Sequence, residues 1–213
     1  MAADTQGNDL EAVNVPVTGR ICIVDYDESN VITNEMIGED VEDPDLPEAY
    51  ATGAIGLVTS DGAPQDSSET GDATEFWQQG YQINGEATLT TAFTAAEDNA
   101  VTRRFVNGSD PDEHGVYGID TLTPDGKFMA YYEEAYKNGR VYRRAGVVTL
   151  TGNEPGQSTR GSVKGRALTV TWQNDDYYGG HKYIESTYDP SESGTTGSTG
   201  STGTTGETGA TGQ

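Results

Sequence analysis

The sequence contains a single cysteine in 213 residues, and this excludes a disulfide within the chain. Cys22 lies in the apolar run Ile21-Cys22-Ile23-Val24, where we expect a buried structural thiol rather than a reactive one. No apolar run approaches the ~20 residues that a membrane-spanning helix needs. Residues 2–6 lack the basic and apolar regions of a signal peptide. We therefore expect assembly in the cytoplasm, without a membrane.

Basic residues are scarce: 12 lysines and arginines stand against 35 aspartates and glutamates, which gives a formal net charge of −23. Residues 1–100 carry 21 acidic side chains against Arg20 alone, a net charge of 1 − 21 = −20. Such a surface repels nucleic acid and excludes a protein that reads or stores DNA. The acidic side chains either keep the protein soluble or line a conduit to which a passing polyanion does not stick.

Signatures of catalysis and of metal binding are also missing, so we expect neither an enzyme nor a cofactor. The two histidines, His114 and His181, are not spaced as metal ligands. Residues 25–30 begin like a calcium loop, but the glycine and glutamate required at its sixth and twelfth positions are absent. The pairs Glu133-Glu134 and Asp175-Asp176 form no catalytic dyad, because adjacent residues of a strand point to opposite faces.

Strand patterns are clear over the middle of the chain. Residues 86–94 alternate, so that Leu89, Thr91 and Phe93 share one face that can be buried. Residues 15–26 are expected to form a strand pair or one long strand interrupted at Thr18-Gly19. Further strands are expected over 55–59 and 161–172, and polar surface loops over 39–48 and 62–71. The chain therefore has the pattern of a mainly β (α+β) domain.

One helix is expected, over about residues 95–106. Thr94 and Glu97 have the spacing of a capping box, in which each side chain satisfies a backbone N–H of the other residue. Val101 and Phe105 then share one helix face, and Asn107-Gly108 is typical of a helix end.

A hairpin is expected over residues 127–150, with Asn138-Gly139 as a two-residue turn. That turn places Glu134 opposite Arg143 and Glu133 opposite Arg144. Opposite charges across two strands stabilise the pairing, so this register is self-consistent.

The two ends of the chain differ in composition from the middle. Residues 1–14 are polar and are expected to form an N-terminal arm before a domain over 15–189. In residues 190–213 glycine recurs at every third position from Gly194, most often after threonine. The period is that of collagen, but the triplets contain no proline, so we expect a flexible tail.

Several short segments occur in an order that points to a known family. They are Ile55-Gly56-Leu57-Val58-Thr59-Ser60-Asp61-Gly62, the acidic Glu69-Thr70-Gly71-Asp72, Phe76-Trp77 followed by Gly80, and an alternating strand that leads into a helix with Glu97 and Asn99. In this order, over roughly residues 15–172, the chain resembles the major tail tube proteins of phages with long non-contractile tails. Val17-Thr18-Gly19-Arg20-Ile21 fits the first strand of that family.

The resemblance implies a β-sandwich or barrel domain with one flanking helix and a structural role in a virion tail. Six copies would form a ring, and stacked rings would form an acidic conduit for genome ejection. The implied partners are further copies of the chain, the tape measure and tail terminator proteins, and double-stranded DNA in transit. An alternative is a carbohydrate-binding β-sandwich of a virion or cell-surface fibre, which Trp77, Trp172, Tyr177 and Tyr178 favour.

Contacts between copies are expected to join acidic and basic segments of the chain. Opposite charges across a head-to-tail interface fix its register and speed association. The candidate contact residues are Asp61, Asp66, Glu69, Asp72, Arg160, Lys164 and Arg166.

Overall fold

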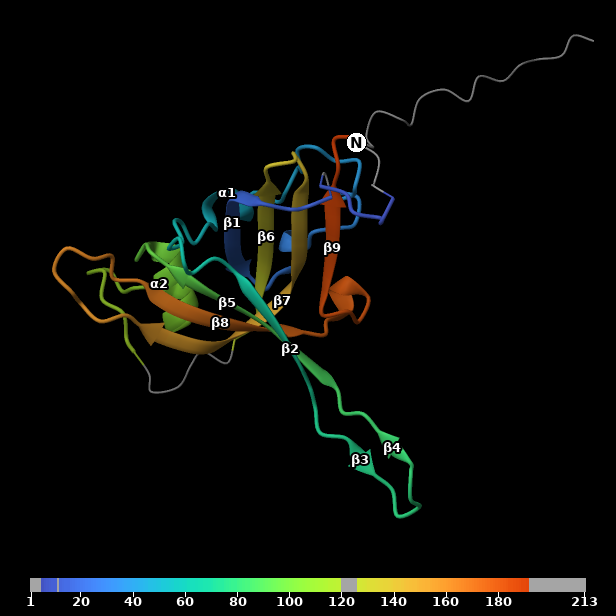
Figure 1. The fold of residues 1–213 in the computed structure, drawn as a ribbon. Coiled ribbons are helices and arrows are strands. Elements are labelled where there is room, and N and C mark those ends of the chain that lie inside the picture. Colours follow the sequence, from blue (N-terminus) through green and yellow to red (C-terminus); the bar gives the residue numbers. More distant parts are fainter. Residues whose placement is uncertain (1–4, 11, 120–125, 192–213) are drawn as a thin grey trace, which may run out of the picture.

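The computed structural model describes residues 5–10, 12–119 and 126–191. The fold is mainly β, with an antiparallel sheet and few helices, as expected (Figure 1). The elements are, in chain order, β1 (Pro16–Asp25), the 3-10 helix η1 (Glu28–Asn30), α1 (Ala49–Thr52), β2 (Gln65–Thr70), β3 (Thr74–Glu75), β4 (Gln82–Ile83), β5 (Ala87–Ala95), α2 (Ala100–Asn107), β6 (Phe128–Tyr136), β7 (Val141–Pro155), β8 (Arg166–Gln173), the 3-10 helix η2 (Asp176–Tyr178) and β9 (Tyr183–Tyr188).

Strand β7 is long and changes neighbours along its length. Its residues 141–148 pair with β6, residues 141–146 also pair with β9, and residues 147–155 pair with β8. The register with β8 shifts between Leu150 and Gly152, and such an extra residue bends a strand. The sheet therefore has two parts that share β7: β1-β6-β7-β9 and β7-β8-β5-β2.

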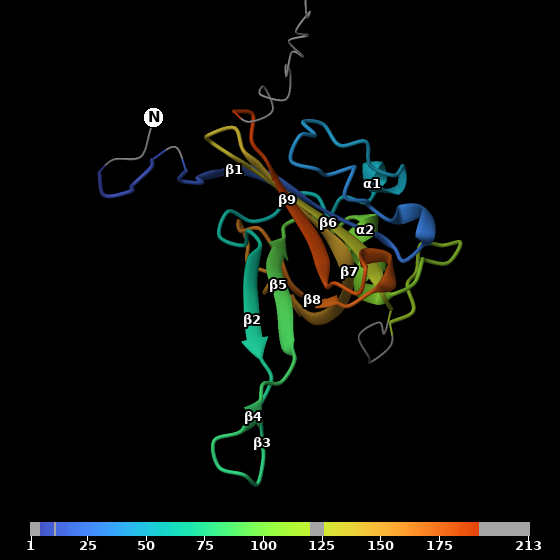
Figure 2. The same cartoon turned by 90° about the vertical axis from the view of Figure 1, so that its right-hand side faces the viewer.

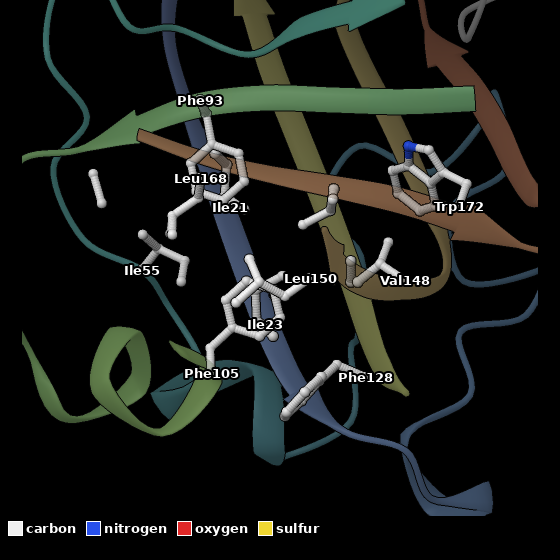
Figure 3. Packing of buried hydrophobic residues seen from close by; sticks show 13 residues of the cluster. Ile21, Ile23, Ile55, Phe93, Phe105, Phe128, Val148, Leu150, Leu168 and Trp172 are labelled. Carbon is white, nitrogen blue, oxygen red and sulfur yellow. The ribbon is translucent and has the colours of Figure 1, made fainter. Parts of the chain in front are cut away.

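The first part of the sheet is buried on both faces. Ile21 and Ile23 of β1 belong to one core, whereas Cys22 and Val24 belong to a second core on the opposite face. A continuous apolar run is what a strand covered on both sides requires, so the expected burial of Cys22 is confirmed. Figure 3 shows the first core, where side chains of β1 meet Phe93 of β5 and Leu168 of β8 among others.

The segment between β1 and β2 closes the second core. Ile32, Ile37 and Tyr50 from this segment are buried against the sheet. The guanidinium group of Arg143, which is buried, donates to the backbone carbonyls of Val41 and Glu42. Residues 39–48 are irregular, as expected, but they are held in place by this buried arginine.

Strand β5 confirms the alternation predicted for residues 86–94. Thr91 and Phe93 are buried, and Phe93 packs in the first core. On its two sides β5 pairs with β8 and β2.

The loop expected over residues 62–71 is mostly a strand, so that prediction was wrong. β2 pairs with β5 from Gln65–Ala92 to Thr70–Ala87, and the hairpin continues beyond the main sheet into β3 and β4. We call residues 71–86 the arm. In two views at right angles the arm stands away from the rest of the fold (Figures 1 and 2).

The expected capping box is wrong, because α2 begins at Ala100. Thr94 is still in β5, and the carboxylate of Glu97 accepts from the backbone N–H of Leu57 instead (2.8 Å). Asn99 is the N-cap and accepts from the N–H of Thr102 (2.9 Å). The helix ends as expected, with Gly108 at a positive φ of 69°.

The hairpin over residues 127–150 is present, but its predicted register is wrong by one residue. Gly139 has a φ of 87°, and the N–H of Tyr136 donates to the carbonyl of Arg140 (2.9 Å), so the loop has three residues instead of two. Glu133 therefore lies opposite Arg143, with their charged groups 3.2 Å apart.

Two expected strands are shorter than predicted. Over residues 55–59 only Val58 forms an isolated bridge, to Ala95. β8 begins at Arg166, so residues 161–165 belong to a loop. The expected glycine-rich tail lies, from residue 192 on, outside the described residues.

Candidate functional site

The arm carries large apolar side chains that are not buried. Trp77 is 97% exposed, and Phe76, Tyr81 and Ile83 are also exposed. The arm's own pairing is short, since β3 and β4 share only the pairs Thr74–Ile83 and Glu75–Gln82. Large apolar side chains left in contact with water are typical of surfaces that bind another molecule.

All charged residues of the arm are acidic. It contains Asp72, Glu75 and Glu86 and no lysine or arginine. Glu86 meets Lys182 of the main fold at 3.4 Å, but the side chain of Glu86 remains largely exposed. A partner of the arm therefore has to offer basic groups together with apolar surface.

The strand that leads into the arm, β2, is bonded near its first residue to one buried arginine. Asp66 of β2 accepts from Arg144 of β7 (2.8 Å) and from the hydroxyl of Thr91 (2.6 Å), which itself accepts from the indole N–H of Trp172 (2.9 Å). Burial would lower the pKa of Arg144, but the bond to Asp66 and the nearby Tyr142 raise that pKa above its usual value. Arg144 therefore stays charged under all working conditions.

A basic loop lies at the other end of the same part of the sheet. We call residues 156–165, between β7 and β8, the basic loop; it has no acidic residue, and Arg160, Val163 and Lys164 are exposed. It follows Pro155 and precedes Arg166, which pairs with Ala95 at the end of β5 that is farthest from the arm. Figure 1 shows this orange loop and the arm on different sides of the fold.

Exposed apolar surface adjoins the basic loop as well. Val163 is largely exposed, and so is Leu57. The carbonyl of Leu57 accepts from the N–H of Ala96 (2.8 Å), which directly follows the end of β5 that pairs with Arg166. The pKa of Asp98 is lowered, first by its bond to Arg103 and further by Arg166 and Lys164. This end of the fold thus combines cations with apolar groups.

The predicted contact residues fall into three places. Asp66 and Glu69 lie on β2, and Asp72 begins the arm. Asp61 lies at the opposite end, in the turn where Gly62 exchanges two backbone hydrogen bonds with Thr59 and Thr94. The basic candidates Arg160, Lys164 and Arg166 lie together in or next to the basic loop.

The arm-tip side chains and Arg144 were missed as candidate site residues. Phe76 contributed to the family resemblance and Trp77 also to the carbohydrate-binding alternative, but neither was named as a contact residue, although two adjacent aromatic residues within an acidic polar stretch indicate an exposed apolar site. Arg144 gave no such signal, because its role depends on a register that the turn did not reveal.

A second polar cluster surrounds Asp175, whose side chain is only 4% exposed. Asp175 accepts from Lys127 (2.9 Å), from the hydroxyl of Tyr26 (2.9 Å) and from the N–H of Tyr177 (3.1 Å). Burial would raise the pKa of Asp175, but these bonds outweigh it and lower that pKa. These bonds tie the turn before β9 to Tyr26 and Lys127 and so stabilise that turn.

The described residues offer little for acid–base or metal chemistry. Burial raises the pKa of the Cys22 thiol, which opposes its use as a nucleophile. Within residues 5–10, 12–119 and 126–191 there is no group of three or more metal-ligating side chains of the His, Cys, Asp or Glu type. In that same part of the chain no helix is long and apolar enough to cross a membrane.

Comparison with known proteins gives one partial match. No family model matches the chain. The chain is 28% identical over 121 residues to the imidazole glycerol phosphate synthase hisHF of Schizosaccharomyces pombe, and the match covers 53% of this chain and 22% of the relative. The chain thus spans about a fifth of the length of that relative.

This match contradicts the function expected from the family resemblance. The relative is named as a synthase of a small metabolite, which is a metabolic enzyme and not a structural protein. The expected tail tube subunit with its acidic conduit is therefore corrected, and so is the alternative of a carbohydrate-binding fibre domain.

Proposed function

We propose that this chain is a protein-binding β-domain that contacts its partner through the arm. Its two sheet parts, packed around the first core, would form a β-sandwich that supports the arm. The observation that carries the proposal is the exposed tip, with Phe76, Trp77, Tyr81 and Ile83. Burying one such side chain stabilises an association by about 1.5–3 kcal/mol, and tryptophan and tyrosine are enriched among residues that dominate binding energies.

The partner that fits the arm is a second copy of this chain. The arm offers Asp72 and Glu75 beside its aromatic residues, and the basic loop offers Arg160 and Lys164 beside Val163. The two surfaces lie at opposite ends of β5 and β8, so that contact between two copies leaves one arm and one basic loop free. Such contacts are heterologous, and the association continues head to tail.

The first experiment measures the molar mass of the protein by sedimentation over a range of concentrations. We expect Phe76→Ser with Trp77→Ser to weaken association about 10-fold or more, because the apolar anchor is lost. Lys164→Glu, which reverses a charge of the basic loop, should also weaken association, and Lys137→Glu, on the turn between β6 and β7, is its matched charge control. A chain that stays monomeric at every concentration would overturn the self-association.

A mixing experiment tests the direction of the contact. One variant carries Asp72→Lys and Glu75→Lys in the arm, and another carries Arg160→Glu and Lys164→Glu in the basic loop. Each variant alone should associate weakly because one of its surfaces repels the unchanged other surface. Mixed, they should associate head to tail in alternation, since the reversed arm attracts the reversed loop and the unchanged arm attracts the unchanged loop. Equal association of each variant alone and in the mixture would exclude this contact.

The partial relative favours a second candidate function, a segment of a metabolic enzyme. The 28% identity over 121 residues is the observation that supports it. The test is formation of imidazole glycerol phosphate by the purified chain. Turnover that depends on the chain would establish an enzyme, whereas its absence, together with self-association, would favour the protein-binding domain.

A further inference from the structure

The side chain of Arg144 on β7 contacts side chains of three other strands, β2, β8 and β9. Its guanidinium group contacts Asp66 of β2 at 2.8 Å and Glu185 of β9 at 3.7 Å. It also lies over the rings of Tyr183 (4.3 Å) and of Trp172 (5.6 Å), on β9 and β8. Asp66 in turn accepts a hydrogen bond from Thr91 of β5, so this one side chain links β7 to β2, β8 and β9 and, through Asp66, to β5.

The surroundings of this side chain form a guanidinium site. Two carboxylates, of Asp66 and Glu185, supply acceptors, and the rings of Tyr142, Trp172 and Tyr183 supply faces that attract a flat cation. The indole N–H of Trp172 and the carboxylate of Asp66 share the Thr91 hydroxyl, so the walls are fixed as well. The side chain of Arg144 fills this site and is itself only 8% exposed.

Strand β2 has little else to hold it. It is the outermost strand of its sheet part and pairs on one side only, with β5. Each residue of β2 is exposed. Of the β2 side chains, Asp66 makes the contact that reaches the other part of the sheet, through Arg144 of β7.

We infer that Arg144 is the positioning residue of the arm: through Asp66 it locks β2 onto the body and so fixes the direction in which the tip projects. The inference rests on the proposed function only in assuming that the direction of the arm matters for binding. The effect of Arg144 on the position of β2 occurs within one molecule, so it can be tested on the monomer.

The first readout is amide hydrogen exchange in β2, measured at a concentration where the protein is monomeric. A charged hydrogen bond of this kind is worth about 1.5–3 kcal/mol, so Arg144→Ala should accelerate exchange in β2 about 10- to 100-fold. Exchange in β1 and β6 should change much less. Arg103→Ala is the matched control, because Arg103 also meets an aspartate at 2.8 Å, but on the exposed helix α2.

Chemical rescue separates positioning from packing. In Arg144→Ala, millimolar guanidinium should slow the exchange of β2 again, whereas ammonium or sodium at equal ionic strength should not. If Arg144→Ala fails to fold, Asp66→Asn removes the same contact from the exposed side and should accelerate exchange in β2 alone. Unchanged exchange in β2, in whichever of the two variants folds, would overturn the inference.

The second readout is the direction of the arm. Spin labels at Gln79→Cys in the arm and Lys137→Cys in the turn between β6 and β7 report the distance between them, and the native Cys22 is buried and does not react. We expect a narrow distance distribution that broadens in Arg144→Ala and narrows again with guanidinium. A distance distribution that broadens in Arg144→Ala supports the inference even if copies of the chain do not associate. A distribution that is unchanged in Arg144→Ala overturns the inference, even if Trp77 proves essential for association.

Discussion

The two tryptophans of this chain lie in regions that differ in burial, packing and hydrogen bonding. Trp172 is 3% exposed, packs in the first core and donates its indole N–H to Thr91. Trp77 is 97% exposed on the arm, and the arm has only a short pairing of its own. One tryptophan thus stabilises the fold, and the other is free for a partner. The same residue type therefore serves stability in one region and binding in the other.

The largest expected effect is that of Trp172→Ala. Removing a fully packed tryptophan leaves a cavity and costs about 3–5 kcal/mol of the free energy of unfolding. Part of this loss comes from the hydroxyl of Thr91, which loses its donor. Urea unfolding followed by circular dichroism measures the change, with Trp77→Ala as the matched control, for which we expect a change within about 0.5 kcal/mol. Equal losses in both variants would remove the distinction between the two regions.

A smaller effect is expected for Asp175→Ala, and it should depend on pH. The pKa of Asp175 is lowered in the folded protein, so its stabilisation is present above the pKa of an unfolded aspartate, about 3.9, and is lost as the pH falls through the folded pKa. At neutral pH we expect a loss of about 1–3 kcal/mol in the free energy of unfolding, because the bonds from Lys127 and Tyr26 are lost.

The test is the difference in stability between the wild-type chain and Asp175→Ala as a function of pH. Other aspartates with lowered pKa values, such as Asp98 and Asp189, titrate in both proteins and cancel in the difference. The difference should shrink below about pH 4. A difference that stays constant down to the lowest accessible pH would show that the carboxylate charge of Asp175 does not stabilise the fold.

The sequence predicted the buried core around Trp172 better than the exposed strand and arm that carry Trp77. The apolar run at Ile21–Val24 and the alternation around Phe93 predicted buried strands correctly, because burial imposes a pattern on side chains. β2 has no buried residue. It is held by backbone pairing with β5 and by the contacts of Asp66 with Thr91 and Arg144, so the pattern of residues 62–71 was that of a loop. Local rules describe regions that pack on the core, and they fail where an exposed strand depends on contacts with residues distant in the sequence.

The errors of detail arose where two local signals competed. Thr94 has the spacing of a helix cap, but pairing of β5 with β8 continues to Ala95, and Asn99 caps the helix instead. Asn138-Gly139 favours a two-residue turn, but the loop formed has three residues with Gly139 at positive φ. A shift of one residue moves every side chain of a strand to the other face. The predicted register placed Arg144 opposite Glu133, and it therefore gave no indication that Arg144 contacts Asp66.

The smallest expected effect on stability is that of removing the arm altogether. Residues 71–86 can be replaced by Asn-Gly, because Thr70 and Ala87 are a paired position of β2 and β5 and a two-residue turn can join them. Apart from Gly85, which is half-buried, each residue of the arm is exposed, so its loss removes almost no buried apolar surface. The shorter hairpin also costs less closure entropy. We expect the free energy of unfolding to change by less than about 1 kcal/mol.

The measurement uses the fluorescence of Trp172, the one tryptophan that the shortened protein keeps. This fluorescence should shift on unfolding from buried to exposed emission, without the background of Trp77. A loss of more than about 2 kcal/mol would mean that the arm packs on the body and stabilises the fold. Trp77 and Trp172 would then differ in exposure, but both regions would contribute to stability.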